Sequence, residues 1–509
     1  MIALVASSLL TGAASTRSRC AGLVGMAAVV TDATLVDASD TEGEHCDVRG
    51  LVAPNVRFHL KLPTDYSGRY LQLGCGGFCG ELVEPTLRPC VTAPGDMAVA
   101  TTDDGHTGTG DVPSVDADWA RDDRAARDDW QFRAPHVVSR AAKDVIARYY
   151  GAPPTYSYFS GCSNGGREAL LLAQRYPDDF DGIAAGAPAN QLSALIVHQA
   201  WLARANTDVH GDPILTADKL PGLHAAVLAR CDHLDGLVDG QLDDPRDCDF
   251  DPAALLCPAG GKACLTPAQV DTVRKLYDGP RTPEGRRLYP AGQPRGSELA
   301  WNRWIVPTDD GALAARLADN YLRHFAGARP TTLADFRFTA AEFHRLSAEG
   351  VRGNAMSLDL TGFHRAGGKL LMWHGWGDEA IPAAGLLDYH ARLAARHPQG
   401  LADWVRVFMV PSLHHCGRGD TLTSFDPLPD LIRWTEHGTA PDRITAHGHA
   451  PDGTPRTRPV FPYPLRAKYD GTGSTDDAAN FTPVPPPVPR KDAVDWLGTH
   501  LHGLPGPVG

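Results

Sequence analysis

The chain has fewer basic than acidic residues. Lys and Arg together number 48, and Asp and Glu together 61, in a chain of 509 residues, so the formal net charge is -13 with neutral His. Phosphate backbones are bound through an excess of Lys and Arg, so this balance argues against a broad nucleic-acid-binding role. The length corresponds to two or three domain-sized units.

The sequence also lacks a membrane-spanning run. Beyond the N-terminus, no segment approaches the roughly 18 uninterrupted apolar residues that a membrane helix needs. The first residues, MIALVASSLLTGAAS, are apolar and end in small residues, as secretory signals do, but they lack a basic region. Residues 1–18 are therefore a candidate signal segment, partial in form, whose cleavage is left open.

Cysteine is plentiful, but no Cys-x-x-Cys pair suggests a zinc ribbon. Eleven cysteines are many for a cytosolic enzyme. Structural disulfides form and persist in oxidising compartments, so the sequence predicts a secreted, extracellular protein.

One stretch organises the chain. Thr155–Pro177 begins with an aromatic and β-branched run typical of a buried strand, turns at GCSNG, and continues as an apolar helix pattern. Gly-x-Ser-x-Gly between a strand and a helix predicts a nucleophile elbow, in which a tight turn lifts Ser163 clear of the sheet. A serine nucleophile needs a base and backbone N–H groups that receive the oxyanion.

A glycine-rich loop, residues 74–80 (GCGGFCG), follows an early strand. In α/β hydrolases such a loop supplies one oxyanion N–H, and the residue after the nucleophile supplies the other. We therefore expect the donors to be Asn164 and Gly77, with Gly76 as the less favoured choice in the loop. The alternative is a plain turn pinned by the two cysteines of the same loop.

Apolar strands alternate with helical segments, which predicts an α/β fold with a parallel, doubly wound sheet. The expected strands are Val56–Leu62, Arg69–Leu73, Met97–Thr102, Gly182–Ala187, Lys369–Trp373 and Val405–Val410. The rhythm stops near Asn190 and returns near Gly368. We expect core residues 19–190 and 368–509, with residues 191–367 inserted as a lid over the carboxyl edge of the sheet.

Candidate acids and bases follow the two late strands. The first of these strands precedes Asp378 and Glu379, and the second precedes His414 and His415. The chain order Ser, Asp, His is that of α/β hydrolases. Asp378 is preferred because it is the first carboxylate after the strand and its glycine turn.

Cysteines distinguish between the two histidines. Cys162 immediately precedes Ser163, and Cys416 immediately follows His415. A disulfide holds its Cα atoms roughly 4.4–6.8 Å apart, so a Cys162–Cys416 bridge would bring Ser163 and His415 together. The alternative is that Cys162 is a buried free thiol.

These residues resemble the signature of the tannase/feruloyl esterase family, which includes the mono(hydroxyethyl) terephthalate hydrolases. The resemblance covers nearly the whole chain through GCGGFCG, TTDDGH, GCSNGGRE, HGWGDEAIP, LHHCGRG and FPYPLRAKYDGTG. It implies an α/β-hydrolase core with a large lid that cleaves feruloyl, galloyl or related esters of aromatic carboxylic acids. The chain departs from many members at Phe461 and Thr482, where they carry a late cysteine pair.

The resemblance also implies a structural calcium ion in the lid, at CDHLDGLVDGQ (residues 231–241). Ca²⁺ prefers six to eight oxygen ligands. By resemblance these are the side chains of Asp232, Asp235 and Asp239 and the carbonyls of Leu237 and Gln241. The alternative is a solvated acidic turn. Nearby disulfides are expected between Cys231 and Cys248 and between Cys257 and Cys264.

The predicted mechanism starts with attack of Ser163 on an ester carbonyl. His415 acts as general base and then acid, Asp378 orients it, and an acyl-enzyme forms. An acyltransferase on the same triad, or a non-catalytic calcium-stabilised binding protein, remain alternatives. The identity of the aromatic acid and the oligomeric state are left open, as is the pairing of Cys20, Cys46, Cys75, Cys79 and Cys90. Trp301, Trp304 and Phe336 are candidate lid contacts by composition only.

Overall fold

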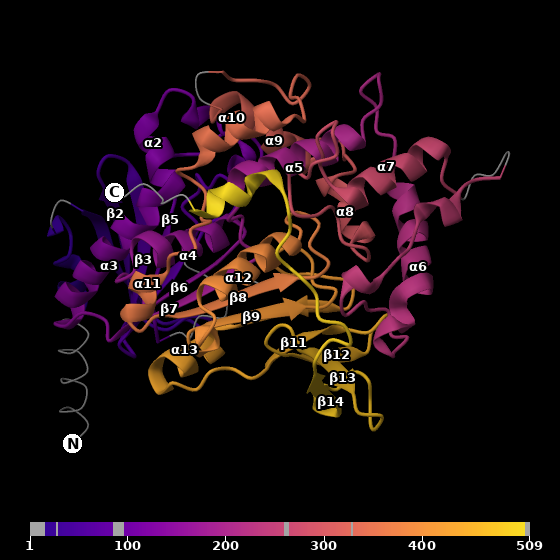
Figure 1. Cartoon of the computed structure of the whole chain (residues 1–509). Helices are drawn as coiled ribbons and strands as arrows, with labels where there is room; N and C mark the ends of the chain where they lie inside the picture. The colour runs from indigo at the N-terminus through magenta and orange to yellow at the C-terminus, as the bar shows by residue number, and fades with distance from the viewer. Residues whose placement is uncertain (1–15, 27–28, 85–95, 259–263, 327–328, 504–509) are drawn as a thin grey trace.

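The computed structural model describes residues 16–26, 29–84, 96–258, 264–326 and 329–503. Most of the candidate signal segment, and Cys90, lie outside these residues. Nine strands form one sheet through the middle of the molecule (Figure 1). They are β1 (Val30–Val36), β2 (His45–Val52), β3 (Val56–Pro63), β4 (Arg69–Leu73), β5 (Ala98–Thr102), β6 (Tyr156–Cys162), β7 (Gly182–Gly186), β8 (Lys369–Gly375) and β9 (Val405–Val410).

The sheet is mixed. Its order is β1-β2-β3-β5-β4-β6-β7-β8-β9, and the strands from β5 to β9 in this order are parallel. Strands β1, β2, β3 and β5 pair antiparallel. The prediction of a parallel sheet is therefore right for six strands and wrong at the N-terminal edge. Residues 53–55 connect β2 to β3, and so short a connection permits only an antiparallel pair.

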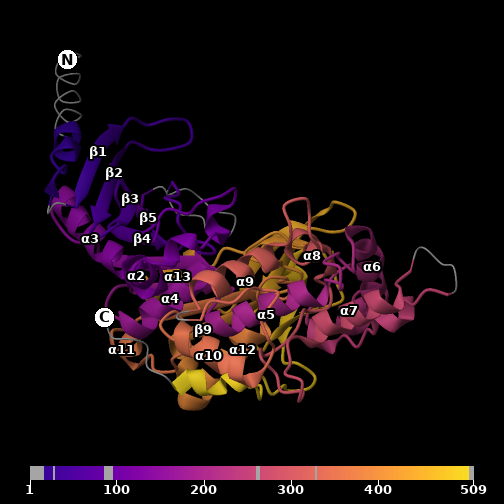
Figure 2. The same ribbon diagram turned by 90° about the horizontal axis from the view of Figure 1, so that it is seen from above.

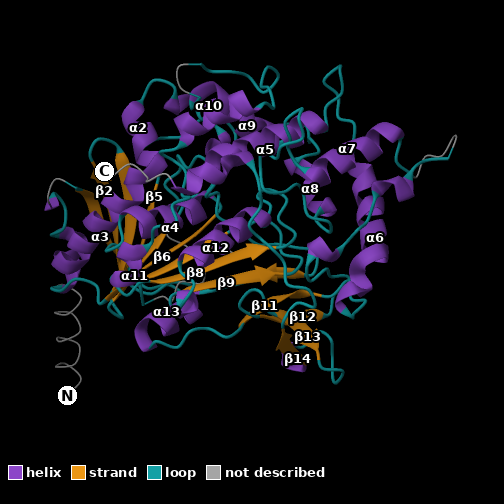
Figure 3. Cartoon of the chain, viewed as in Figure 1, coloured by secondary structure: helices purple, strands orange, loops and turns teal. Residues whose placement is uncertain are grey.

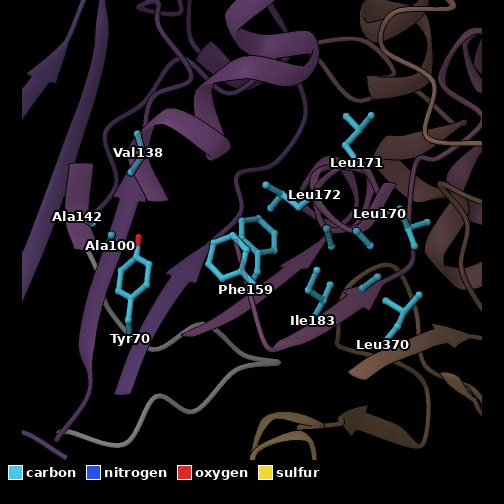
Figure 4. Packing of buried hydrophobic residues seen from close by; sticks show 14 of the residues in the cluster. Tyr70, Ala100, Val138, Ala142, Phe159, Leu170, Leu171, Leu172, Ile183 and Leu370 are labelled. Carbon is cyan, nitrogen blue, oxygen red and sulfur yellow. The ribbon is translucent and has the colours of Figure 1, made fainter. Parts of the chain in front are cut away.

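Helices cover both faces of the sheet because its central strands are apolar on both sides. In β8, Leu370 and Met372 pack into the cluster that contains residues of α3 (Ala134–Tyr150) and α4 (Asn164–Arg175). Leu371 and Trp373 pack instead into the cluster that contains residues of α13 (Leu428–His437). Figure 4 shows the first of these clusters around Phe159 and Ile183. Continuous apolar strands of this kind are typical of a doubly covered parallel sheet.

A long insertion separates β7 from β8. Its helices lie along one side of the sheet in Figure 1 and stand out in Figure 3, where the segment is mostly helix and loop. The labelled α-helices from residue 124 on are α2 (Arg124–Asp128), α3 (Ala134–Tyr150), α4 (Asn164–Arg175), α5 (Leu192–Ala205), α6 (Leu220–Cys231), α7 (Pro267–Asp278), α8 (Trp301–Trp304), α9 (Leu313–His324), α10 (Ala340–Gly350), α11 (Thr361–Arg365), α12 (Ala384–Arg396) and α13 (Leu428–His437).

The insertion, with α5 to α11, packs around helices of its own. Helix α5 is buried on nearly every side, and it contacts α9, α10 and α7. Seen from above, α5, α9 and α8 cross the molecule while α6 and α7 extend to its far end (Figure 2). Helix α7 begins with a capping box between Thr266 and Gln269.

Two small sheets follow β9. They contain β10 (Leu422–Ser424), β11 (Ile444–His449) and β12 (Pro455–Val460), and then β13 (Arg466–Tyr469) and β14 (Phe481–Val484). The described part of the chain ends with a 3-10 helix, Leu497–Gly503. Among the described residues, no helix is long and apolar enough to span a membrane.

Candidate active site

Ser163 lies at a sharp turn between β6 and α4. Its backbone is in the left-handed region, with φ 65° and ψ -120°. A Cβ on Gly161 would stand 2.5 Å from the carbonyl carbon of Gly165, and one on Gly165 would stand 3.1 Å from Gly74. The glycines therefore permit a close approach that larger residues would block, and the local geometry is that of the predicted elbow.

Asp378 and His415 meet beyond the ends of β8 and β9. His415 Nδ1 lies 2.9 Å from Oδ2 and 3.1 Å from Oδ1 of Asp378. The Asp378 side chain is fully buried, and its Oδ1 also accepts the backbone N–H groups of Ala380 and Ile381 at 2.8 and 2.7 Å. These bonds fix the carboxylate, and the carboxylate in turn orients the imidazole.

The alternative residues of these loops have other partners. The ring of His414 bonds Asp420 at 3.2 Å through Nε2. Glu379 accepts the backbone N–H of His415 at 3.2 Å. The geometry thus pairs Asp378 with His415, as the sequence predicts, and leaves Glu379 to hold the histidine loop.

Electrostatics favour an ion pair between Asp378 and His415. Burial alone would raise the pKa of Asp378, but the charge of His415 and hydrogen bonds from His374 and His415 hold that pKa below its usual value. Burial would lower the pKa of His415, yet the negative charge of Asp378 raises it overall. The carboxylate therefore stabilises the imidazolium that forms when a histidine takes a proton.

A disulfide between Cys162 and Cys416 joins the serine turn to the histidine loop, with Cα atoms 5.8 Å apart. The predicted bridges Cys231–Cys248 and Cys257–Cys264 are also present. The open N-terminal set resolves into Cys20–Cys46 and Cys75–Cys79. Sequence reasoning left this pairing open because five cysteines without spatial constraints allow many pairings.

Ser163 and His415 line one cavity of about 650 Å³. Its apolar wall includes Trp304, Leu313 and Leu317 from the insertion and Trp373 from β8. The Trp304 ring lies 5.8 Å from that of His415. Two other aromatic candidates, Trp301 and Phe336, are buried in helix clusters of the insertion and are not among the lining residues.

The glycine-rich loop also borders this cavity. Gly76 and Gly77 line it, and Gly77 has φ 57°, with Ser114 O only 2.1 Å from where a Cβ would stand. The Cys75–Cys79 disulfide closes the loop. The same loop is therefore both a turn held by its cysteines and a part of the cavity wall. In the described part of the chain, the backbone N–H groups of Gly77 and Asn164 donate to no protein acceptor.

A buried acid pair lies behind the loop and was missed by sequence reasoning, although both residues fall within the TTDDGH and GCSNGGRE motifs. Glu168 accepts Asn164 Nδ2 at 2.6 Å and the Cys75 N–H at 3.3 Å. Asp104 lies next to it, and burial together with the charge of Glu168 raises the pKa of Asp104 well above its usual value. Glu168 thus ties the start of α4 to the glycine-rich loop.

The acidic loop of the insertion folds around Asp232. Its carboxylate accepts the N–H groups of Asp239, Gly240 and Gln241 at 3.0–3.3 Å. Asp235 accepts the N–H of Leu237 at 3.0 Å.

The charges of this loop are incompletely balanced. Arg458 bonds the Asp239 carboxylate at 2.6 Å. Burial, and the nearby charges of Asp243 and Asp239, raise the pKa of Asp235 to about 8. The candidate metal ligands of this loop are carboxylate and carbonyl oxygens, which is the ligand type that Ca²⁺ prefers.

Comparisons with known proteins agree with this architecture. The solved structures of feruloyl esterase B from Aspergillus oryzae and tannin acyl hydrolase from Aspergillus niger match with TM-scores of 0.80 and 0.70. They cover 92% and 94% of this chain, and 100% and 94% of their own, at 24% and 21% identity. At these identities the match establishes the α/β fold.

Sequence relatives are closer. A mono(2-hydroxyethyl) terephthalate hydrolase of Piscinibacter sakaiensis is 33% identical over 87% of this chain and 85% of its own length. A probable feruloyl esterase of Arthroderma benhamiae is 30% identical over 83% of this chain and 81% of its own. A family model described as "Tannase and feruloyl esterase" matches residues 41–484.

These matches show that the chain is a carboxylic ester hydrolase. Within that class, the chain belongs to the tannase and feruloyl esterase family.

Proposed function

We propose that this protein is a secreted serine esterase that hydrolyses esters of aromatic carboxylic acids. The observation that carries the proposal is the contact of 2.9 Å between Asp378 Oδ2 and His415 Nδ1, beside a cavity that His415 shares with Ser163. The five disulfides Cys20–Cys46, Cys75–Cys79, Cys162–Cys416, Cys231–Cys248 and Cys257–Cys264 support secretion.

The chemistry follows from the positions of these groups. Ser163 Oγ attacks the ester carbonyl while His415 Nε2 takes its proton, because Nδ1 is occupied by Asp378. The backbone N–H groups of Asn164 and Gly77 hold the oxyanion. His415 then protonates the leaving alcohol. In the second half of the reaction, His415 takes a proton from a water molecule that attacks the acyl carbon, and it returns that proton to Ser163 Oγ as the acid is released.

The cavity supports an aromatic substrate. Trp304 and Trp373 contribute two indole rings to its lining, and Leu313 and Leu317 add aliphatic surface. Rings of this kind pack well against a flat aromatic acid. The relatives named for feruloyl and terephthalate esters point to the same substrate class. The insertion, which supplies three of these four residues, acts as a lid in this proposal.

We also propose a structural Ca²⁺ in the acidic loop. The side chains of Asp232, Asp235 and Asp239 and the carbonyls of Leu237 and Gln241 would hold it. Asp232 is buried and Asp235 and Asp239 are partly buried in one short loop. Arg456 and Arg458 pair with Asp239, and a divalent cation would balance the charge of the other two carboxylates. The bound ion would stabilise the loop between α6 and Cys248 and supplies no step of the ester chemistry.

A hydrolysis panel tests the esterase proposal. Turnover of methyl gallate, methyl ferulate, mono(hydroxyethyl) terephthalate and p-nitrophenyl acetate is measured with wild type, Ser163→Ala and a control. The control is Ser139→Ala, which changes a buried serine of α3. We expect turnover of aromatic esters that disappears in Ser163→Ala alone, by at least about 10³-fold.

Product analysis with an added alcohol separates hydrolysis from acyl transfer, since a transferase would release the ester of that alcohol. A fluorophosphonate probe should label Ser163 in wild type. Retained turnover in Ser163→Ala, or no labelling together with no turnover, would refute the proposal.

A further inference from the structure

The cavity beside Ser163 is lined by positively charged side chains, although the chain as a whole is acidic. Arg303, in the insertion, and Arg418, which follows the histidine loop, both line it. Among the described residues that line the cavity, no Asp or Glu occurs. The whole chain carries a net charge of -13, so the cavity is a local reversal of the overall charge.

Neither guanidinium is neutralised by the protein. In the part of the chain that the structure describes, no ion pair involves Arg303 or Arg418, and neither side chain donates a hydrogen bond. By contrast, two buried or half-buried arginines outside the cavity are paired: Arg458 bonds Asp239 at 2.6 Å, and Arg466 bonds Asp244 at 2.7 Å. The five donors of each cavity arginine are therefore available to a ligand.

The backbone of both arginines is fixed at the cavity, and their side chains are exposed there. Each has a left-handed conformation, with φ 70° at Arg303 and φ 60° at Arg418, which non-glycine residues adopt only where surrounding contacts impose it. The Arg303 N–H donates to Val306 O at 2.8 Å, and the Arg418 N–H donates to Thr423 O at 2.8 Å.

The two arginines also come from different parts of the fold. Arg303 lies beside Trp304, whose ring is near that of His415, and Arg418 lies three positions after His415. The positive charge of Arg418 is close enough to oppose protonation of His415. A bound acyl group at Ser163 would therefore have a cation within reach on the insertion side and another on the core side.

We propose that Arg303 and Arg418 form an anion-binding subsite, and that the preferred substrate is an ester that carries a free carboxylate. The proposal rests on the esterase function above and narrows its substrate class. Arginine binds carboxylates in paired, charge-assisted hydrogen bonds, so the subsite would orient such an ester over Ser163. The carboxylate belongs either to the acid part or to the alcohol part of the ester.

Matched ester pairs test this subsite. Monomethyl terephthalate carries its carboxylate on the acid part, and dimethyl terephthalate is its neutral counterpart. Chlorogenate carries the carboxylate on the alcohol part, and its methyl ester is neutral. For each pair, the ratio of kcat/KM for the charged ester to that for the neutral ester is measured in wild type and variants.

Wild type should favour the charged ester of at least one pair, and the pair that responds identifies which part bears the carboxylate. Arg303→Gln and Arg418→Gln should each lower the ratio about tenfold, mainly through KM, and the Lys variants should retain part of it. The control Arg148→Gln, an exposed arginine of α3, should leave the ratio unchanged. High salt should also reduce the wild-type ratio.

A wild-type ratio of one or less in both pairs would overturn the proposal, and so would an equal loss on charged and neutral esters in both Arg variants. If the enzyme turned over no ester at all, the esterase proposal would fail separately. Calorimetric titration with terephthalate would then test the subsite alone. Binding to wild type but not to the double Gln variant would support it, and equal binding, or none to either, would overturn it.

Discussion

Replacing both Cys162 and Cys416 by alanine removes a crosslink that closes a loop of 254 residues. In the chain-entropy description, a crosslink stabilises by restricting the unfolded chain, and more so for longer loops. That relation gives about 5.5 kcal/mol for the loop closed by Cys162–Cys416. For Cys257–Cys264, whose residues are separated by 7 positions, the same relation gives about 2.4 kcal/mol.

The matched comparison is therefore between the two double alanine variants. Urea unfolding, followed by tryptophan fluorescence, should show a loss of unfolding free energy that is about 3 kcal/mol larger without Cys162–Cys416 than without Cys257–Cys264. Removing the long-range bridge should also lower kcat on p-nitrophenyl acetate by about 10²-fold under native conditions, because the serine turn and histidine loop lose their direct connection.

The control variant should keep its kcat, since its bridge lies in the insertion beside the Leu256–Leu265 pair, whose residues do not line the cavity. The reasoning would be refuted if both double variants lost the same free energy and the Cys162/Cys416 variant kept full activity. That result would mean that packing alone holds Ser163 and His415 together.

Three further results are expected. Asp378 raises the pKa of His415 above 6.5 despite its burial, so the neutral base is lost, and kcat/KM falls, as the pH drops through a value above 6.5. Asp378→Asn should move the acidic limb of the pH profile of kcat/KM to lower pH and lower kcat about 10⁴-fold. A profile whose acidic limb does not move would contradict the pairing of Asp378 with His415. Glu168→Ala should lower kcat about tenfold or more with little change in KM, because the glycine-rich loop loses its tie to α4. The control Glu436→Ala removes a carboxylate that pairs with Arg69 and should lower stability alone. Chelation of calcium should lower Tm by several degrees in wild type but not in Asp239→Asn, and an equal response in both would exclude the proposed ion.

Local patterns carried much of the prediction. The turn at Ser163 follows from short-range sterics, because small residues between an apolar strand and an apolar helix permit a backbone that others do not. The strands from Lys369 and Val405 follow from continuous apolar runs. The bridge between Cys162 and Cys416 was accessible because each cysteine is adjacent in sequence to a residue whose role could be predicted.

Other features had no local signal. The antiparallel strands β1 and β2 were missed because both are partly exposed and mix polar with apolar residues. Pairing stabilises them, since β1 pairs with β2 and β2 pairs with β3. The buried neighbours Asp104 and Glu168 are 64 positions apart in the chain, as their numbers show. Their interaction depends on the tertiary fold, which brings α4 beside the turn that follows β5.

The sequence by itself determined the class of protein, the six parallel strands of the main sheet and the residues predicted to act on the ester, because these depend on short motifs and on apolar runs. Only the tertiary structure decided that Trp304 and not Trp301 lines the cavity, that Arg303 reaches it, and that Asp104 lies beside Glu168. Each of these depends on packing between segments distant in the chain, where one residue's displacement changes the direction of a side chain while leaving the motif intact.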